Sequence, residues 1–245
     1  MPPPQHPETQ KNSRPAYRYY DLIMAAFVAV LLCSNMIGPG KSCKLRIFGI
    51  GLVFGAGNVF FPISYIFGDV LTEVYGYAKS RRVIWAGFGA LIFSALMGQI
   101  IIAMPPNPEE PFNALMQPAL ETVFGNGPRI VTASMLAFWA GDFVNSFVLA
   151  KMKVWTRGKH LWTRTVGSTI LGQLVDSAIF YPVAFFGTWT SLTLAKVLAF
   201  NWFFKVAVEV VLTPVTYAVV GALKKAENED WYDRGTDFTP FSLRD

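Results

Sequence analysis

Six long apolar runs alternate with short polar segments along the chain. They lie at about 20–37, 58–77, 82–104, 129–150, 165–187 and 194–221. A helix needs roughly 20 predominantly apolar residues to cross the hydrocarbon core of a bilayer, and each run approaches or exceeds that length. The pattern predicts an all-α membrane protein, built as a bundle of six transmembrane helices.

Two connections between the runs have a character of their own. The segment 38–57 is rich in glycine, and its apolar stretch 47–54 is too short to span a membrane. Irregular backbone at membrane depth needs protein or water beside it, so a re-entrant segment or a short outer hairpin is expected there. The second connection, 105–128, is rich in Pro, Asn and Glu, and a short amphipathic helix is expected around 118–124.

The ends of the chain divide it into three parts. Residues 1–17 are polar and proline-rich and lack the apolar core of a signal peptide, so we expect a disordered cytoplasmic tail. Residues 18–224 form the transmembrane domain, which begins with an uncleaved signal anchor. Residues 225–245 form a cytoplasmic C-terminal tail. Its several aromatic residues predict that it packs against the cytoplasmic face of the bundle.

Composition agrees with this picture and adds an orientation. The 245 residues are 53% hydrophobic and 15% charged, whereas soluble domains carry about a quarter charged residues. The basic residues that give the net charge of +5 lie between the apolar runs, so we expect membrane lipid and not nucleic acid as the partner. Basic residues accumulate on one side, which the positive-inside rule makes cytoplasmic together with both termini. They are Lys11, Arg14 and Arg18, then Lys79, Arg81 and Arg82, then Lys151, Lys153, Arg157, Lys159 and Arg164, and finally Lys224 and Lys225.

Charged residues inside the apolar runs are the main functional signal. One such charge at a bilayer centre costs roughly 2.5–3.5 kcal/mol on insertion scales, so these residues face a bundle interior or a wet cavity. They are Asp69 and Glu73 in the second run, Asp142 in the fourth, Asp176 in the fifth, and Lys205 and Glu209 in the sixth.

Their spacing places them on shared helix faces. Residues three or four apart lie side by side on a helix. The pairs with this spacing are Asp69 with Glu73, Asp142 with Asn145, Gln173 with Asp176, and Lys205 with Glu209. Together they predict a polar core within the bundle.

A purely structural reading stands beside the functional one for most of these residues. Lys205 and Glu209 can form an ion pair within their helix. Asp69 and Glu73 can join a helix-end network with the basic residues 79–82. Asp142 can bridge to the basic connection 151–159. Asp176 lies mid-run with no basic residue nearby in sequence, which favours ligand binding there.

The sequence argues against an enzyme. Its two histidines, His6 and His160, lie in a tail and a connection, so a buried Ser-His pair or a histidine-based metal site is not expected. No phosphate-cradling glycine motif is present. Cys33 and Cys43 lack metal-ligand spacing, which favours free thiols. We therefore expect no cofactor and no metal.

Short motifs in a fixed order resemble one family of membrane transporters. They are Phe61-Pro62-Ile63-Ser64-Tyr65 with Asp69 and Thr72-Glu73-Val74-Tyr75-Gly76, Arg81-Arg82, Gly141-Asp142-Phe143 with Asn145-Ser146, Arg164-Thr165 with Gly167-Ser168-Thr169, Asp176-Ser177, Lys205 with Glu209 and Pro214, and Phe238-Thr239-Pro240-Phe241. This order is similar to that of the YhhQ-type queuosine precursor transporters, the vitamin uptake transporter family, over about 20–241. The family also looks like the substrate-binding components of energy-coupling-factor vitamin transporters.

The resemblance implies import of a deazaguanine base across a bacterial inner membrane. The expected cargo is 7-cyano- or 7-aminomethyl-7-deazaguanine, a precursor of queuosine in tRNA, carried by a stand-alone transporter. Two alternatives stay open, a binding component energised by a separate ATPase complex and a membrane scaffold. A homodimer is compatible with the sequence, because Ala25 and Ala29 permit close helix approach.

Chemistry selects the candidate site residues. A carboxylate can accept from the N1–H and the amine of a guanine-like edge, while an amide or ammonium donates to its carbonyl. We expect Asp176 or Glu209 to read that edge. The candidate substrate-binding residues are Asn35, Tyr65, Asp142, Asn145, Gln173, Asp176, Trp202, Lys205 and Glu209, and those for coupling or gating are Asp69 and Glu73.

Overall fold

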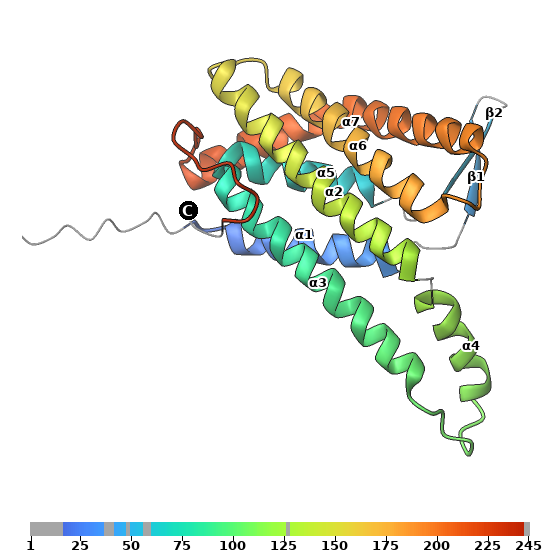
Figure 1. Cartoon of the computed structure of the whole chain (residues 1–245). Helices are drawn as coiled ribbons and strands as arrows, with labels where there is room; N and C mark the ends of the chain where they lie inside the picture. Colours follow the sequence, from blue (N-terminus) through green and yellow to red (C-terminus); the bar gives the residue numbers. More distant parts are fainter. Residues whose placement is uncertain (1–16, 37–41, 48–49, 56–59, 126–127, 243–245) are drawn as a thin grey trace, which may run out of the picture.

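Helices account for most of the computed structural model, which describes residues 17–36, 42–47, 50–55, 60–125 and 128–242. The predicted runs coincide with helices (Figure 1). The helices are α1 (Tyr20–Met36), α2 (Phe61–Val70) with the π-helical turn η2 (Leu71–Tyr75), α3 (Tyr77–Ala103), α4 (Asn113–Phe124), α5 (Pro128–Trp155), α6 (Leu161–Phe185) and α7 (Ser191–Glu227). Among the described helices, α3, α5, α6 and α7 are long and apolar enough to cross a membrane, and α1 is shorter. A multi-pass membrane protein is therefore shown, whereas a count of six spans stays a prediction.

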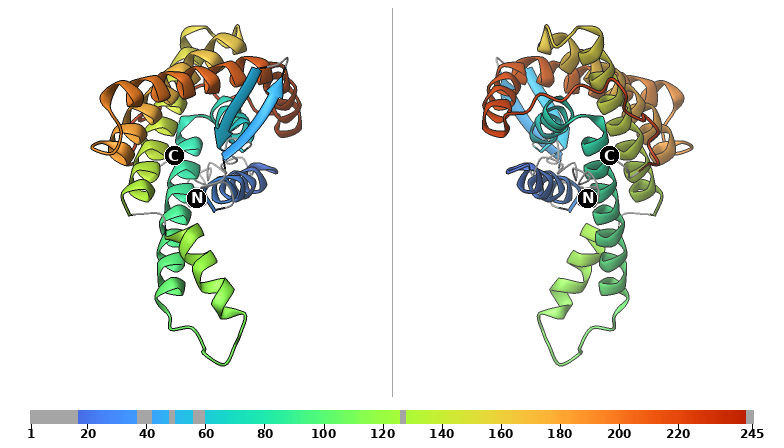
Figure 2. Two further views of the ribbon diagram at one scale, coloured as in Figure 1. Left: turned by 90° about the vertical axis from the view of Figure 1, so that its right-hand side faces the viewer. Right: turned by 90° about the vertical axis from the view of Figure 1, so that its left-hand side faces the viewer.

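The segment between α1 and α2 contains a β-hairpin. Strands β1 (Ser42–Ile47) and β2 (Ile50–Gly55) pair antiparallel, with Ser42 opposite Gly55 and Ile47 opposite Ile50. The all-α expectation thus has one exception here, in a segment for which the sequence left a re-entrant stretch or a hairpin open. In Figures 1 and 2 the hairpin lies at the end of the bundle where α6 turns into α7. Entry of this segment into the membrane stays a prediction.

The second and third runs are joined by a single residue instead of the expected basic connection. Gly76 has φ +85°, and α3 begins directly after it. Any Cβ at this position would overlap the indole ring of Trp231, so both the backbone angle and the close approach require glycine. The basic residues 79–82 consequently lie in the first turns of a helix, where Arg81 is fully buried.

Two glycines bring α5 and α6 into close contact. A Cβ on Gly141 would lie 2.9 Å from Cβ of Asp176, and one on Gly172 would lie 2.8 Å from Cβ of Asn145. Helix association in membranes relies on such small residues because lipid offers no hydrophobic driving force between helices. This crossing sets the polar residues of the two helices beside one another.

The far end of α3 and the whole of α4 project away from the other helices (Figures 1 and 2). The amphipathic helix expected around 118–124 is longer than predicted and begins at Asn113. Gln117 donates to the carbonyl of Ile102 at 3.1 Å, and Gln99 donates to that of Phe124 at 2.8 Å. These bonds hold α4 against α3 to form an arm.

The segment 231–241, here called the strap, lies across the end of the bundle opposite the hairpin (Figure 1). Arg81 donates to the carbonyls of Asp237 at 2.8 Å and Thr239 at 2.7 Å, and the indole of Trp85 donates to that of Pro240 at 2.7 Å. The backbone N–H of Tyr77 donates to Asp233. The tail therefore packs on the bundle, as its aromatic content predicts.

Candidate functional site

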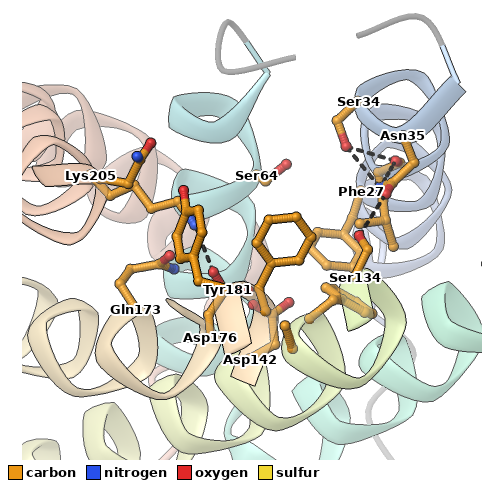
Figure 3. Close-up of a pocket in the computed structure, with 15 residues that line it drawn as sticks. Phe27, Ser34, Asn35, Ser64, Ser134, Asp142, Gln173, Asp176, Tyr181 and Lys205 are labelled. Carbon is orange, nitrogen blue, oxygen red and sulfur yellow. Dashed lines mark hydrogen bonds and ion pairs between the residues drawn. The ribbon is translucent and has the colours of Figure 1, made fainter. Parts of the chain in front are cut away.

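A cavity of about 250 Å³ lies within the helix bundle and is called the central cavity here (Figure 3). Five helices contribute to it. Its lining residues are Phe27, Leu31, Ser34 and Asn35 of α1, Ser64 of α2, Ser134, Ala137, Phe138 and Asp142 of α5, Gln173, Asp176, Phe180 and Tyr181 of α6, and Asn201 and Lys205 of α7. The candidates Asn35, Asp142, Gln173, Asp176 and Lys205 are thus brought together in one place.

An ion pair forms one side of the cavity. Lys205 Nζ donates to Asp176 Oδ2 at 2.7 Å, and this contact joins α7 to α6. The structural reading of Lys205 with Glu209 is wrong, because the lysine reaches across to the neighbouring helix instead of along its own. Both members of the pair retain some solvent exposure, which fits a wall that faces a cavity.

Two acceptors in the cavity wall have no hydrogen-bond partner among the described residues. Gln173 is 5% exposed, and its Oε1 is buried and unpartnered. The carboxylate of Asp142 makes no hydrogen bond within the described part of the chain, although it interacts electrostatically with Asp176 and Lys205. The expected bridge from Asp142 to the basic connection 151–159 is absent from that part. Buried acceptors without partners are costly and invite a ligand that donates.

The opposite wall is neutral and polar. Asn35 donates to the carbonyl of Leu31 at 2.9 Å and to Ser34 Oγ at 3.1 Å. Ser134 donates to Asn35 Oδ1 at 3.2 Å, which links α5 to α1 (Figure 3). Aromatic rings, among them Phe138 and Phe180, complete the lining between the two polar walls.

The remaining candidate binding residues lie elsewhere. Asn145 donates to Asp69 Oδ1 at 3.2 Å, and Trp202 donates from its indole to the carbonyl of Ile170 at 2.9 Å. Glu209 is completely buried outside the cavity lining, so it is the less suitable of the two carboxylates expected to read a base edge. The side chain of Tyr65 lies outside the described residues.

Asp69 and Glu209 form a second buried acidic site, between α2 and α7. Both are 0% exposed, and they interact electrostatically. Asp69 Oδ2 and both carboxylate oxygens of Glu209 have no hydrogen-bond partner among the described residues. This pair is therefore chemically unsatisfied, in contrast to the carboxylate of Glu73 one helical turn further along.

Glu73 lies at the centre of an ionic cluster, hereafter the Glu73 cluster, which comprises Glu73, Lys153, Arg164, Lys224 and Asp230. Arg164 donates to both carboxylate oxygens at 2.7 Å, and Lys224 Nζ lies 2.6 Å from Oε1. Lys153 Nζ lies 3.5 Å from the same oxygen and donates to the carbonyl of Glu73. A helix-end network was expected here, but its basic members come from α5, α6 and α7 and not from residues 79–82.

The cluster extends to the segment after α7. Asp230 accepts from Lys153 at 2.6 Å and contacts Lys224 at 2.7 Å. Burial by itself would raise the pKa of Asp230, but the hydrogen bonds from the two lysines outweigh it and hold that pKa below its ordinary value. Lys153 also donates to the carbonyl of Trp231 at 2.6 Å, which ties the cluster to the strap.

Several residues that line the central cavity were not predicted from the sequence, although helical spacing indicates them. Ser134, Phe138 and Asp142 are four residues apart in succession, and so are Asn201 and Lys205. A search one or two turns from each intramembrane charge would have found them. Ser64 and Phe27 have no such signal, because their place depends on how α1 and α2 pack against α5.

Comparison with known proteins decides the family. A family model described as "Putative vitamin uptake transporter" matches residues 55–219. The chain belongs to this family. A curated relative from Bacillus subtilis (strain 168), named "Probable queuosine precursor transporter", is 32% identical over 169 residues, which cover 69% of this chain and 72% of the relative. No solved structure matches the chain. The family and the relative show a membrane transporter and not an enzyme.

Proposed function

We propose that this transporter imports queuosine precursors, 7-cyano-7-deazaguanine or 7-aminomethyl-7-deazaguanine, across the bacterial inner membrane. We further propose that it does so as a stand-alone carrier with both termini in the cytoplasm. The name of the Bacillus subtilis relative supports this cargo. The observation that carries the proposal is that two acceptors in the wall of the central cavity, Asp142 and Gln173, have no hydrogen-bond donor among the described residues.

The cavity suits a small flat base. Its volume of about 250 Å³ lies below the roughly 300–1,000 Å³ of typical drug-sized pockets. A guanine-like edge presents N–H groups that the Gln173 carbonyl can accept, and Lys205 can donate to its carbonyl. Phe138, Phe180 and Tyr181 supply faces on which a planar ring stacks. Asp176 then positions Lys205 while sharing the same wall.

Coupling is assigned to Asp69. Asp69 is a fully buried carboxylate with one oxygen that has no partner among the described residues, and it lies near Glu209, both of whose oxygens lack one. This arrangement suits a residue that takes up and releases a proton. Glu73, the other candidate, is held by three basic side chains, and that arrangement favours a structural role. A carrier of this type needs no separate ATPase.

Uptake by the purified chain in liposomes tests the function. We expect accumulation of 7-deazaguanine precursors that increases with an inward proton gradient. Lys205→Gln should abolish most uptake, whereas Lys196→Gln, which alters an exposed lysine on the same helix, should transport normally. Uptake that requires added ATPase subunits would show a binding component instead of a carrier. If no deazaguanine protects the purified protein against heating, the scaffold alternative replaces transport.

A further inference from the structure

Among the described residues, the charges that face the central cavity do not balance. Two carboxylates, Asp142 and Asp176, line it together with one ammonium, Lys205. Asp176 is paired with that ammonium at 2.7 Å. Asp142 is attracted by Lys205 and repelled by Asp176, and it has no hydrogen-bond donor of its own among the described residues. One carboxylate therefore remains to be neutralised.

Hydrogen-bonding capacity is unbalanced in the same direction. Gln173 lines the cavity and is more than nine-tenths buried, and its Oε1 has no hydrogen-bond partner among the described residues. Across the cavity, the Asn35 oxygen already accepts from Ser134, so that wall is satisfied. The unpartnered acceptors, Asp142 and Gln173, thus both call for a donor, and they lie on α5 and α6 beside the Gly141–Gly172 crossing. A ligand rich in N–H groups that also carries a positive charge would meet them.

We propose that the central cavity selects a positively charged base, with Asp142 as its counter-ion. This inference rests on the proposed function and decides between its two cargoes. The aminomethyl substituent of 7-aminomethyl-7-deazaguanine is an ammonium at neutral pH, and its three donors can reach Asp142. The cyano substituent is neutral and only accepts, so it leaves that carboxylate unpaired. A charge-assisted hydrogen bond of this kind is stronger than a neutral one.

The first test compares ligands on the full-length chain in detergent. Equilibrium binding is measured for 7-aminomethyl-, 7-hydroxymethyl- and 7-cyano-7-deazaguanine. The hydroxymethyl base has the size of the aminomethyl base without its charge, which isolates the electrostatic contribution. We expect the ammonium to bind roughly 10- to 100-fold more tightly than either neutral base. Equal affinity for the charged and the hydroxymethyl base overturns the inference, and absence of binding by all three overturns the proposed function as well.

The second test locates the selectivity. Asp142→Asn should lower affinity for the aminomethyl base until it matches the hydroxymethyl base, while affinity for the cyano base changes by less than about threefold. Asp21→Asn, a substitution at the start of α1 outside the cavity lining, should keep the full preference. A preference that survives in Asp142→Asn would place the counter-ion elsewhere. The comparison of the three ligands on the unaltered protein does not depend on how this variant folds.

Discussion

The Glu73 cluster and the central cavity contain similar residues in opposite states. In the cluster, a completely buried carboxylate is surrounded by Lys153, Arg164 and Lys224. Its oxygens accept hydrogen bonds from Arg164 and Lys224, and Lys153 forms an ion pair with it. In the cavity, Asp142 has no donor among the described residues, and Gln173 Oε1 is likewise unpartnered. Both regions place charge within apolar helices, but only the cluster completes its own hydrogen bonding.

The difference separates two uses of buried charge. A buried ion pair stabilises a fold only when geometry and further hydrogen bonds offset the cost of removing both charges from water. The Glu73 cluster meets that condition and joins η2, α5, α6 and α7. The central cavity does not meet it, because Asp142 and Gln173 lack donors among the described residues. Intramembrane polar groups without such partners mark substrate or ion sites. Stability and binding should therefore respond to substitution in separate places.

Removal of the central carboxylate of the cluster should have the largest effect. Glu73→Gln leaves three basic side chains near a neutral amide in a buried site. Loss of one partner of a buried ion pair destabilises by about 3–5 kcal/mol. We expect a large fall in melting temperature of the detergent-purified protein, whereas Glu109→Gln in the exposed part of the arm should melt like the unaltered chain. Equal melting of the two variants would remove the structural role of the cluster.

A methyl group added at the α5–α6 crossing should have the second-largest effect, and it should lower both the stability of the fold and ligand binding in the central cavity. In Gly172→Ala the new Cβ lies 2.8 Å from Cβ of Asn145, so the helices must separate. Overpacking of this kind costs about 1–3 kcal/mol, and it also moves Gln173 relative to Asp142. Melting temperature and substrate affinity should both fall. Gly89→Ala, where a Cβ meets no atom within 4 Å, is the matched control and should change neither.

Substitution of a cavity residue that has no hydrogen-bond partner should lower ligand affinity without lowering the stability of the fold. Gln173→Leu removes an amide oxygen that has no partner to lose, so stability should stay within about 0.5 kcal/mol of the unaltered chain. Affinity for a deazaguanine should fall at least tenfold, because the ligand loses an acceptor in a buried position. Melting curves recorded with and without ligand report both quantities. A variant with a much lower melting temperature but normal ligand affinity would contradict our assignment of the central cavity as the ligand-binding site.

The smallest expected effect is a pH dependence at the edge of the cluster. The pKa of Asp230 is held below its ordinary value in the folded protein, so this carboxylate contributes stability above its unfolded pKa of roughly 3.9. That contribution is lost as the pH falls through the lower folded value. Asp230→Asn should have a slightly lower melting temperature than the unaltered protein near neutral pH, and this difference in melting temperature should disappear below about pH 4. A difference in melting temperature that grows at acidic pH would contradict the pairing of Asp230 with Lys153 and Lys224.

The sequence predicts the helices well because apolar runs of this length have one stable arrangement in lipid. It predicts the partners of the charges poorly. Asp69 and Glu73 share a helix face, yet one is unsatisfied and the other is fully paired. Lys205 is four residues from Glu209 and pairs with Asp176. Spacing determines which face a side chain occupies, but the neighbouring helix decides what it meets.

The same reasoning explains why the hairpin and the strap were only partly foreseen. Aromatic residues after α7 predicted contact with the bundle, but their register depends on Gly76, whose lack of a side chain admits Trp231. The strands between α1 and α2 depend on pairing within a glycine-rich segment whose pattern is weak. Most of the central cavity could be anticipated from charges and their helical neighbours. Its α1 and α2 walls could not.

The strap also imposes an order on how the protein is made. A ribosome synthesises the chain from its amino end, so residues 231–241 are translated after all of the described helices. Until then Arg81 lacks the carbonyls of Asp237 and Thr239, and Lys153 lacks that of Trp231. Newly made bundles therefore pass through a stage in which these hydrogen bonds between the strap and the helices are not yet formed.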